Sequence, residues 1–228
     1  MYTVYVDELL VHDQASPSDA IHLVEPSLKL ADNSAGSFEF IIPPDHIGYD
    51  SIDLLSDTIS VQREGQTIWS GRPISQSEDF WKRRKYTCEG ALAYLNDSIQ
   101  PDQEYSSTEA SVFFQKLIEI HNEKVGKNRQ FEIGVLSFED MDDPHTYKTQ
   151  FENTWESIKT NFVDRLSGHV YITYNGGGHA PYINYRQSYF ERNAQEVNFG
   201  KNLLDFAQNW DMTNVCTAIF PRGKQVEG

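Results

Sequence analysis

Two histidines lie where a side chain could do chemistry. His46 follows Pro43 and Pro44 in the stretch GSFEFIIPPDHIGYDSI, and His121 lies within LIEIHNEKVG. A histidine near a carboxylate can serve a hydrolase as a general base. The structural alternative makes His46 a polar residue of a turn and His121 a hydrogen-bonded residue of the core or of a domain interface. Because the sequence contains no HExxH, GxSxG, P-loop or GxGxxG string, it favours the structural alternative for both.

The other polar motifs are incomplete. Asp140, Asp142 and Asp143 resemble part of a calcium loop, but Pro144 and the missing glycine and glutamate break the EF-hand spacing. A metal in residues 139–143 stays an open question, and no cofactor is expected. The glycine run 176–178 would need a following helix N-terminus to hold a phosphate, and a strand-like segment follows instead. We predict a hairpin turn there.

The segment FWKRRKY, residues 80–86, interleaves aromatic and basic side chains as some single-strand nucleic-acid binders do. The whole chain, however, has 19 Lys and Arg against 34 Asp and Glu, and its net charge of −15 argues against binding a phosphate backbone. As a strand, the segment places Trp81 and Arg83 on one face, and we predict an edge strand or a subunit contact. A carbohydrate-binding surface that uses Trp69 or Trp81 is a further alternative.

The composition is that of a folded protein. The 228 residues are 39% hydrophobic and 13% aromatic, enough for one to two domains with their own cores. Cys88 and Cys216 fit no metal or disulfide spacing, and both are expected to be small core residues. No apolar run approaches the about 18 residues of a membrane span, and no signal peptide is visible. We therefore expect no membrane partner and synthesis in the cytoplasm.

The elements that would position these residues change in type near Gly90. Before it, TVYV, SLKL and SFEFII alternate in polarity, and SFEFII places Phe38, Phe40 and Ile42 on one face. TISVQREGQTIWSG predicts two short strands around a Glu-Gly turn, and RPISQSEDFWKRRKYTCEG predicts two longer ones. Many short strands between Gly, Asp and Ser turns indicate a small β-barrel or sandwich.

After Gly90 the pattern becomes mixed. ALAYLNDSI predicts a short helix, and SSTEASVFFQKLIEIHNEKVG a longer one, with Ser106 and Glu109 at capping-box spacing and Gly126 after its end. NTWESIKTNFVDRLSG predicts a further helix, followed by a hairpin formed by HVYITY and YINY. The acidic run 132–156 is interpreted as a solvated face. The fold class predicted for the whole chain is α+β and rich in strands.

Six strings occur in a specific order: LADNSAGSFEFIIPPDHIGYDSI, IWSGRPIS, CEGALAYLNDSIQP, LIEIHNEKVGKNRQFEIG, VNFGKNLLDF and TAIFPRG. Together they closely resemble the N-terminal region of the tail-associated (Tal) proteins of siphophages and prophages of Gram-positive bacteria, the prophage endopeptidase tail family. The resemblance covers nearly the whole chain, and the order and spacing of the strings make it specific.

The resemblance implies a structural hub at the tip of a phage tail, similar to the central baseplate hub of contractile-tail phages. Such a hub is a homotrimer in which each subunit contributes two related β-barrels. Residues 1–97 would form the first barrel, residues 98–193 an α+β insertion, and residues 194–228 the start of a second barrel, which either is incomplete here or completes the first. The family typically continues past TAIFPRG, so we expect further chain after it.

The implied partners are other copies of the chain and the distal tail protein ring. The tail tube, the tape measure protein and receptor-binding or lysin modules are further implied partners. DNA would pass through the hub without specific binding, and the protein would reside in the virion. In this family peptidoglycan cleavage belongs to regions C-terminal to the hub, so we expect no catalysis here. A peptidoglycan hydrolase and a cell-wall carbohydrate-binding module remain the alternatives.

The resemblance also marks family-motif and contact candidates, without assigning a catalytic residue or a metal ligand. They are Gly36, Phe38, Pro43, Pro44, His46, Tyr49, Gly71, Arg72, Gly90, Tyr94, Leu95, Asn96, His121, Asn122, Gly200, Asn202 and Leu203.

Overall fold

The structure is a computed structural model that describes residues 1–138, 144–175, 180–188, 198 and 201. The chain divides into two compact units, Met1–Tyr189 and Phe190–Gly228, and every described helix and strand belongs to the first. The second barrel expected at 194–228 lies almost entirely outside the described residues, as do the glycine run 176–178, the aspartates of 139–143 and Cys216. The domain boundaries given above stay predictions.

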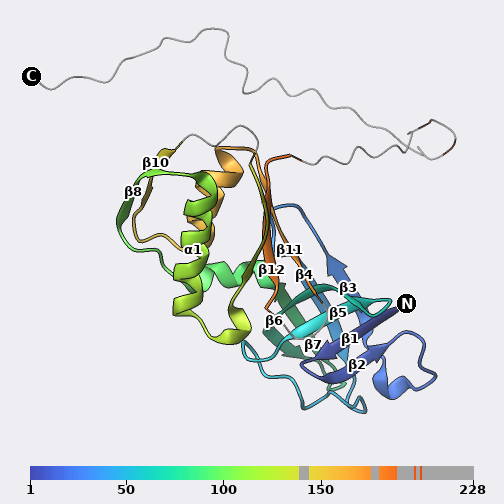
Figure 1. Ribbon diagram of the computed structural model, residues 1–228. Coiled ribbons are helices and arrows are strands. Elements are labelled where there is room, and N and C mark those ends of the chain that lie inside the picture. Colours follow the sequence, from blue (N-terminus) through green and yellow to red (C-terminus); the bar gives the residue numbers. More distant parts are fainter. Residues whose placement is uncertain (139–143, 176–179, 189–197, 199–200, 202–228) are drawn as a thin grey trace, which may run out of the picture. The chain divides into compact units, whose positions relative to one another are not determined.

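Seven strands form one antiparallel sheet (Figure 1). They are β1 (Tyr2–Val6), β2 (Leu9–Asp13), β3 (Val24–Lys29), β4 (Ser37–Ile42), β5 (Ile59–Arg63), β6 (Gln66–Glu78) and β7 (Arg84–Gly90), with the short 3-10 helix η1 (Asp19–Ile21) between β2 and β3. The order in the sheet is β2-β1-β5-β6-β7-β4-β3. His12 of β2 and Leu28 of β3 line the same cavity although their strands are the two edges, so the sheet curls into a half-barrel.

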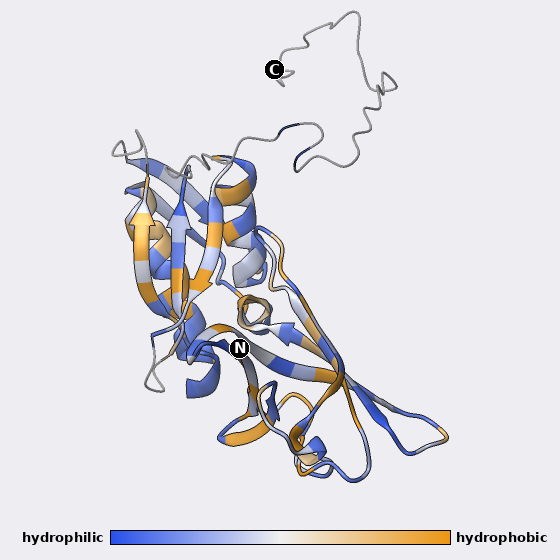
Figure 2. Ribbon diagram, turned by 90° about the vertical axis from the view of Figure 1, so that its right-hand side faces the viewer, coloured by the Kyte–Doolittle hydropathy of each residue, from blue (hydrophilic) through white to orange (hydrophobic). Residues whose placement is uncertain are grey.

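Alternating polarity explains which face of the sheet is buried. Phe38, Phe40 and Ile42 of β4 are 2%, 0% and 0% exposed, as the sequence predicts for one face of a strand. Hydrophobic and hydrophilic residues also alternate along the strands in Figure 2. Between β5 and β6, Glu64 and Gly65 both have positive φ, at 53° and 78°, which suits the tight hairpin turn predicted there. Cys88 is fully buried in the same core.

The edge strand β3 is irregular. Most of its residues are exposed, and its register against β4 shifts between Val24 and Ser27. The shift contains Pro26, which has no N–H to donate, and Glu25, whose φ is 50°. The far edge, β2, pairs only with β1 in the described part of the chain. The predicted barrel is therefore a half-barrel with two edges, and the prediction of a strand-rich α+β fold is confirmed.

The basic segment 80–86 does not form the edge strand that its alternation predicts. Residues 79–83 make the turn of the β6–β7 hairpin, and the strand begins only at Arg84. β7 lies between β6 and β4, well inside the sheet. The alternation of the segment is misleading because the side chain of Asp79 bonds the backbone N–H groups of Trp81 and Arg83, which favours a turn.

The residues after Gly90 form a second layer of helices and small sheets. The helical elements are η2 (Ala91–Asp97), α1 (Ala110–Lys124), η3 (Lys127–Arg129), α2 (Thr154–Ile158) and the π-helix η4 (Lys159–Asp164). The strands are β8 (Gln103–Thr108), β9 (Glu132–Ser137), β10 (His145–Thr149), β11 (His169–Thr173) and β12 (Tyr182–Arg186). β8 pairs with β10, while β12 pairs antiparallel with β11 and parallel with β9.

Two details of the helix prediction are wrong. Ser106 belongs to β8, and the N-cap of α1 is Glu109 with no side-chain hydrogen bond, so there is no capping box. Gly126 follows the C-cap Val125 but has φ −65°, so it does not adopt the left-handed conformation for which glycine is usually selected. The acidic run 132–156 contains β9, β10 and the start of α2, and its acidic residues Glu132 and Glu156 are exposed, as a solvated face requires.

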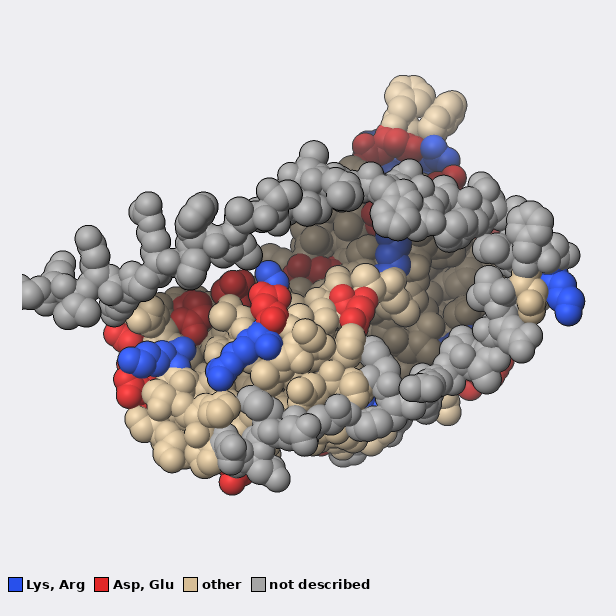
Figure 3. Space-filling model, turned by 90° about the horizontal axis from the view of Figure 1, so that it is seen from above, with Lys and Arg blue, Asp and Glu red and all other residues tan. Residues whose placement is uncertain are grey.

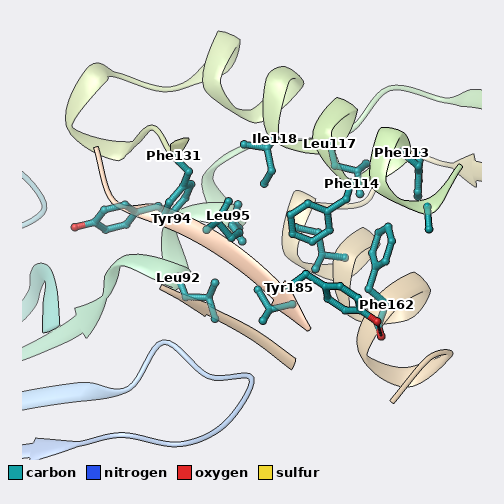
Figure 4. Close-up of a cluster of buried hydrophobic side chains, with 14 of the residues drawn as sticks. Leu92, Tyr94, Leu95, Phe113, Phe114, Leu117, Ile118, Phe131, Phe162 and Tyr185 are labelled. Atoms are coloured by element: carbon teal, nitrogen blue, oxygen red, sulfur yellow. Dashed lines mark hydrogen bonds between the residues drawn. The ribbon is translucent and has the colours of Figure 1, made fainter. Parts of the chain in front are cut away.

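A second hydrophobic core lies beneath α1 (Figure 4). Phe113, Phe114, Leu117 and Ile118 of the helix are at most 1% exposed and recur at three- and four-residue steps, which makes them the buried apolar stripe of an amphipathic helix. The helix packs these side chains toward Tyr185 of β12 and Phe162 of η4, and the rings of Phe114 and Phe162 meet edge to face at 5.1 Å.

Among the described residues no helix has the length and apolar character of a membrane span.

Candidate functional site

The loop after β4 is fixed in place by His46. Pro43 follows the last residue of β4, and its carbonyl accepts the His46 N–H at 3.1 Å. The imidazole is 4% exposed, with Nε2 2.8 Å from the carbonyl oxygen of Val11 and Nδ1 3.0 Å from the amide nitrogen of Gly48. A carbonyl only accepts and an amide N–H only donates, so Nε2 carries the proton, Nδ1 accepts, and the ring is neutral.

The surroundings of His46 do not suit a general base. Burial lowers the pKa of His46, and both ring nitrogens already have backbone partners. A nearby pair of rings, His12 and His22, lies 5.6 Å apart, and burial also lowers the pKa of His12. In the described part of the chain no three His, Cys, Asp or Glu side chains come together as a metal site requires. The position of His46 is that of a side chain that joins a loop to β2.

Tyr49 of the same loop supports the base of the β6–β7 hairpin. Its hydroxyl donates to the carbonyl oxygen of Lys82 at 2.6 Å, and the Arg84 guanidinium lies 3.8 Å from the centre of its ring. Arg84 also donates to the backbone carbonyl of Tyr49 at 2.6 Å and to Asp50 at 2.9 Å. The loop after β4 and the hairpin are therefore one connected surface, although about thirty residues separate them in the sequence.

Arg72 links the half-barrel to η2. It is 8% exposed, and its guanidinium donates to Asp97 of η2 at 2.5 and 2.9 Å and to Glu89 of β7 at 2.8 Å. The hydrogen bonds to Asp97 contribute most to raising the pKa of Arg72. The guanidinium also lies 5.2 Å from the ring of Tyr94, and Asp97 accepts a further bond from Arg129 at 3.1 Å. This bidentate geometry is one that lysine could not reproduce.

Two glycines allow the backbone to cross close to Trp69. A Cβ on Gly71 would lie 2.0 Å from the carbonyl oxygen of Glu89, and one on Gly90 would lie 1.9 Å from that of Ala35. Both would also come within 2.7 Å of the indole of Trp69, which donates to the Ala35 carbonyl at 3.2 Å. Any side chain at either position would displace backbone, so the motif glycines here serve close packing.

Polar bonds join the two cores at this crossing. The amide of Asn33 donates to the carbonyl of Gly168 at 3.1 Å and accepts from the N–H of Val170 at 2.7 Å. The hydroxyl of Tyr174 accepts from the N–H of Ser70 at 2.9 Å. Gly36, at φ 67°, ends the same loop, and Phe38 lies in the half-barrel core. The string around Gly36 is thus a structural junction.

His121 belongs to a chain of buried hydrogen bonds. Its Nε2 donates to the carbonyl oxygen of Arg129 at 3.0 Å, so Nδ1 accepts from the hydroxyl of Ser98 at 2.7 Å. Ser98 in turn accepts from Thr154 at 2.6 Å, and Thr154 accepts from the side-chain amide of Gln100 at 2.7 Å. Burial lowers the pKa of His121, which keeps the neutral form that this chain requires.

The Ser98 hydroxyl and the His121 ring lie at the distance of a catalytic nucleophile and its base, but a substrate has no access to the hydroxyl. Ser98 is 2% exposed, His121 and Gln100 are fully buried, and no substrate could reach the hydroxyl. The arrangement ties η2, α1 and α2 together. No local sequence motif identifies Ser98, because 23 residues separate it from His121.

The remaining candidates divide between the core and local hydrogen bonds. Tyr94 and Leu95 are 3% and 0% exposed and pack in the second core. Asn96 donates to the carbonyl of Ala93 at 3.1 Å, and Asn122 exchanges two bonds with the backbone of Phe131, at 2.8 and 2.9 Å. Pro44 is exposed in the turn after β4. Gly200, Asn202 and Leu203 lie outside the described residues.

Three solved structures are similar to this chain over most of its length. The tail protein of Neisseria meningitidis MC58 has a TM-score of 0.55 at 17% identity, covering 81% of this chain and 50% of that one. Prophage tail protein gp18 of Listeria monocytogenes EGD-e has a TM-score of 0.54 at 15% identity, covering 89% and 56%. This chain has the fold of phage and prophage tail proteins.

A third tail protein agrees with that assignment. The 43 kDa tail protein of prophage MuSo2 from Shewanella oneidensis has a TM-score of 0.50 at 12% identity, covering 81% of this chain and 52% of that one. The chain therefore spans about half the length of the tail proteins that it resembles. No family model matches the sequence, and no curated protein matches it. The tail-protein fold confirms the resemblance read from the sequence at the level of fold.

Proposed function

We propose that this chain is the N-terminal part of a structural hub at the tip of a phage tail. The observation that carries the proposal is the tail-protein fold, shared with tail proteins of three different sources. In this hub, copies of the chain form a homotrimer that joins the distal tail protein ring to the tip and resides in the virion. The tail tube, the tape measure protein and receptor-binding or lysin modules are its further neighbours.

The half-barrel supports an assembly role. Its curled sheet has two edges, β2 and β3, that no described strand covers, and its β6–β7 hairpin extends beyond the sheet. Such features are typical of surfaces that other subunits complete. The candidates for ring or subunit contact are Tyr49 and the exposed Pro44, because His46 is turned inward to Val11.

The net charge fits a DNA channel. With 34 acidic and 19 basic side chains, a hub that lines the channel can turn acidic groups toward the passing DNA. Acidic walls repel phosphates over a Debye length of about 8 Å, so DNA would slide past without binding. A map of the assembled trimer should show an acidic lumen, and a basic or neutral lumen would contradict this role.

The same proposal assigns no catalysis to this chain. Both histidines that could support hydrolysis are buried, at 4% and 0% exposed, and all four of their ring nitrogens have partners within the protein. Any peptidoglycan cleavage by the whole protein would belong to another region.

The test is the mass of the chain in solution, measured by light scattering with and without the distal tail protein of the same phage. We expect a complex whose mass contains three copies of the 26.2 kDa chain per distal tail protein ring. Separate elution of the two proteins over the whole concentration range would refute the proposed role. A complex with any other number of copies would refute the homotrimer alone.

A further inference from the structure

The β6–β7 hairpin ends in two exposed aromatic side chains. Phe80 is 88% exposed and Trp81 is 69% exposed, and they are neighbours at the outermost point of the turn. Figure 2 shows this hairpin extending away from the rest of the sheet, and Figure 3 shows an uncharged end with acidic and basic groups at its base. Exposing two large aromatic rings to water is unfavourable in free energy. Aromatic side chains of this kind are enriched among the residues that dominate the binding energy of protein interfaces.

The turn that carries these rings is held in one conformation. Asp79 accepts from the N–H of Trp81 and from that of Arg83, both at 2.9 Å, and the Asp79 N–H donates to the Arg83 carbonyl at 3.0 Å. Lys82 has φ 62°, and its carbonyl is bonded to the hydroxyl of Tyr49 at 2.6 Å. Because the turn is ordered beforehand, a partner would not have to meet the entropic cost of fixing it.

The charges at the tip favour an apolar partner. Lys82 is paired with Glu78 at 2.8 Å and Arg83 with Asp79 at 2.7 Å, so the basic side chains are already neutralised by neighbours on the hairpin. The rings of Phe80 and Trp81 meet at 87°, which leaves no common flat platform for stacked bases or sugars. A nucleic acid or a glycan is therefore a poor match, and an apolar pocket in a protein is a good one.

The chain has such a pocket at the other end of the half-barrel. A cavity of about 840 Å³ is lined by residues of β1, β4, β5 and β6 and by residues in or next to the edge strands β2 and β3. We call this cavity the mouth. Its lining is mainly apolar and includes Tyr2, Leu23, Leu28, Leu30, Phe38 and Ile68. Arg63 and His12 add polar groups, and the Arg63 guanidinium lies 6.0 Å from the ring of Tyr2. This volume is in the range of pockets that take a drug-sized ligand, which two aromatic side chains approximate.

The tip cannot reach the mouth of its own subunit. Ile68 lines the mouth near the start of β6, while Glu78 ends that strand at the tip. Ten strand residues separate them by roughly 33 Å at about 3.3 Å per residue. A contact between tip and mouth must therefore join two copies head to tail, which is the arrangement that every cyclic trimer uses.

We propose that Phe80 and Trp81 of one copy insert into the mouth of a second copy. The inference rests on the proposed homotrimer and names the two surfaces that meet in it. Each aromatic side chain can bury about 150–250 Å², so the contact alone is below the roughly 1,200 Å² of a standard stable interface. It is a weak contact in isolation, and closing a ring strengthens it.

Sedimentation equilibrium from about 1 to 500 µM tests the contact on the chain itself. We expect the chain to self-associate with increasing concentration, and the double variant Phe80→Ser/Trp81→Ser to associate at least tenfold more weakly. Phe151→Ser is the matched control, because Phe151 is also 69% exposed but lies outside the half-barrel, and it should associate as the unmodified chain does. Equal association of the double variant would overturn the inference while leaving a trimer formed through other surfaces intact.

A disulfide test locates the mouth. In a Cys216→Ser background, one batch carries Trp81→Cys and another carries Leu28→Cys, and the two are mixed and oxidised. The inference expects crosslinks between the two variants in large excess over crosslinks within either batch. A chain that stays monomeric at every concentration and forms no mixed crosslink would overturn the inference. Finding the mouth occupied by another segment of the same chain would overturn it as well. Binding of the distal tail protein, measured separately, shows whether the proposed function fails with it.

Discussion

Replacing Arg72 by methionine should destabilise the protein strongly. The change keeps an apolar stem beside Tyr94 but removes two hydrogen bonds to Asp97 and one to Glu89. Removing one partner of a buried ion pair costs about 3–5 kcal/mol, because a charge is left without compensation. Asp97 and Glu89 are 22% and 29% exposed and Asp97 keeps Arg129, so water and that residue offset part of the loss. We expect the low end, about 3 kcal/mol.

Thermal unfolding followed by circular dichroism measures the effect. At about 2–4 °C per kcal/mol for a chain of this size, the melting temperature should fall by roughly 6–12 °C. Arg83→Met is the matched control, because Arg83 is 45% exposed and bridges Asp79 at the surface, and its melting temperature should not change. The double variant Arg72→Met/Asp97→Asn should lose less than the sum of the single variants. An Arg72→Met protein that melts with the control would refute the assigned link.

Three further predictions address other parts of the molecule. Burial lowers the pKa of both His46 and His121 in the folded protein. The stabilisation that these neutral side chains contribute is therefore complete above about pH 6.5 and is lost as pH falls through the folded pKa values. Urea unfolding should show the free energy of unfolding declining between about pH 7 and 5, and a flat profile would contradict this. Gly90→Ala should lower the free energy of unfolding by about 1–3 kcal/mol, whereas Gly126→Ala, at φ −65° with space for a Cβ beside a flexible side chain, should change it little. In a zymogram the chain should clear no peptidoglycan, and clearing that survives His46→Gln and His121→Gln would place a catalytic site elsewhere in the chain.

The strands of the half-barrel were predictable because burial imposes a period of two. SFEFII shows this period, and Phe38, Phe40 and Ile42 are all in the core. β8 and β9 were not predictable, because they lie in small sheets whose residues are exposed or half-buried and show no such period. The turn at 79–83 was not predicted because its residues alternate in polarity by chance. The backbone conformation there is determined by the hydrogen bonds that the Asp79 side chain accepts.

The candidate residues were found more easily than their roles. Arg72 stood among the motif candidates, but its partner Asp97 is 25 residues away and no spacing rule connects the two. The same holds for Ser98 and Thr154, which reach His121 only after η2, α1 and α2 have packed together. Long-range polar pairs depend on tertiary structure, so a single sequence predicts which residues matter better than it predicts what they touch.

The irregular edge strand β3 makes the two edges of the half-barrel unequal. With Pro26 and Glu25 at its register shift, this edge offers few free N–H groups in a row, so strands of other chains cannot readily extend the sheet there. A partner that meets the half-barrel at β3 would bind through side chains. Pairing through the backbone is left to the opposite edge, β2, which has no second partner strand in the described part of the chain.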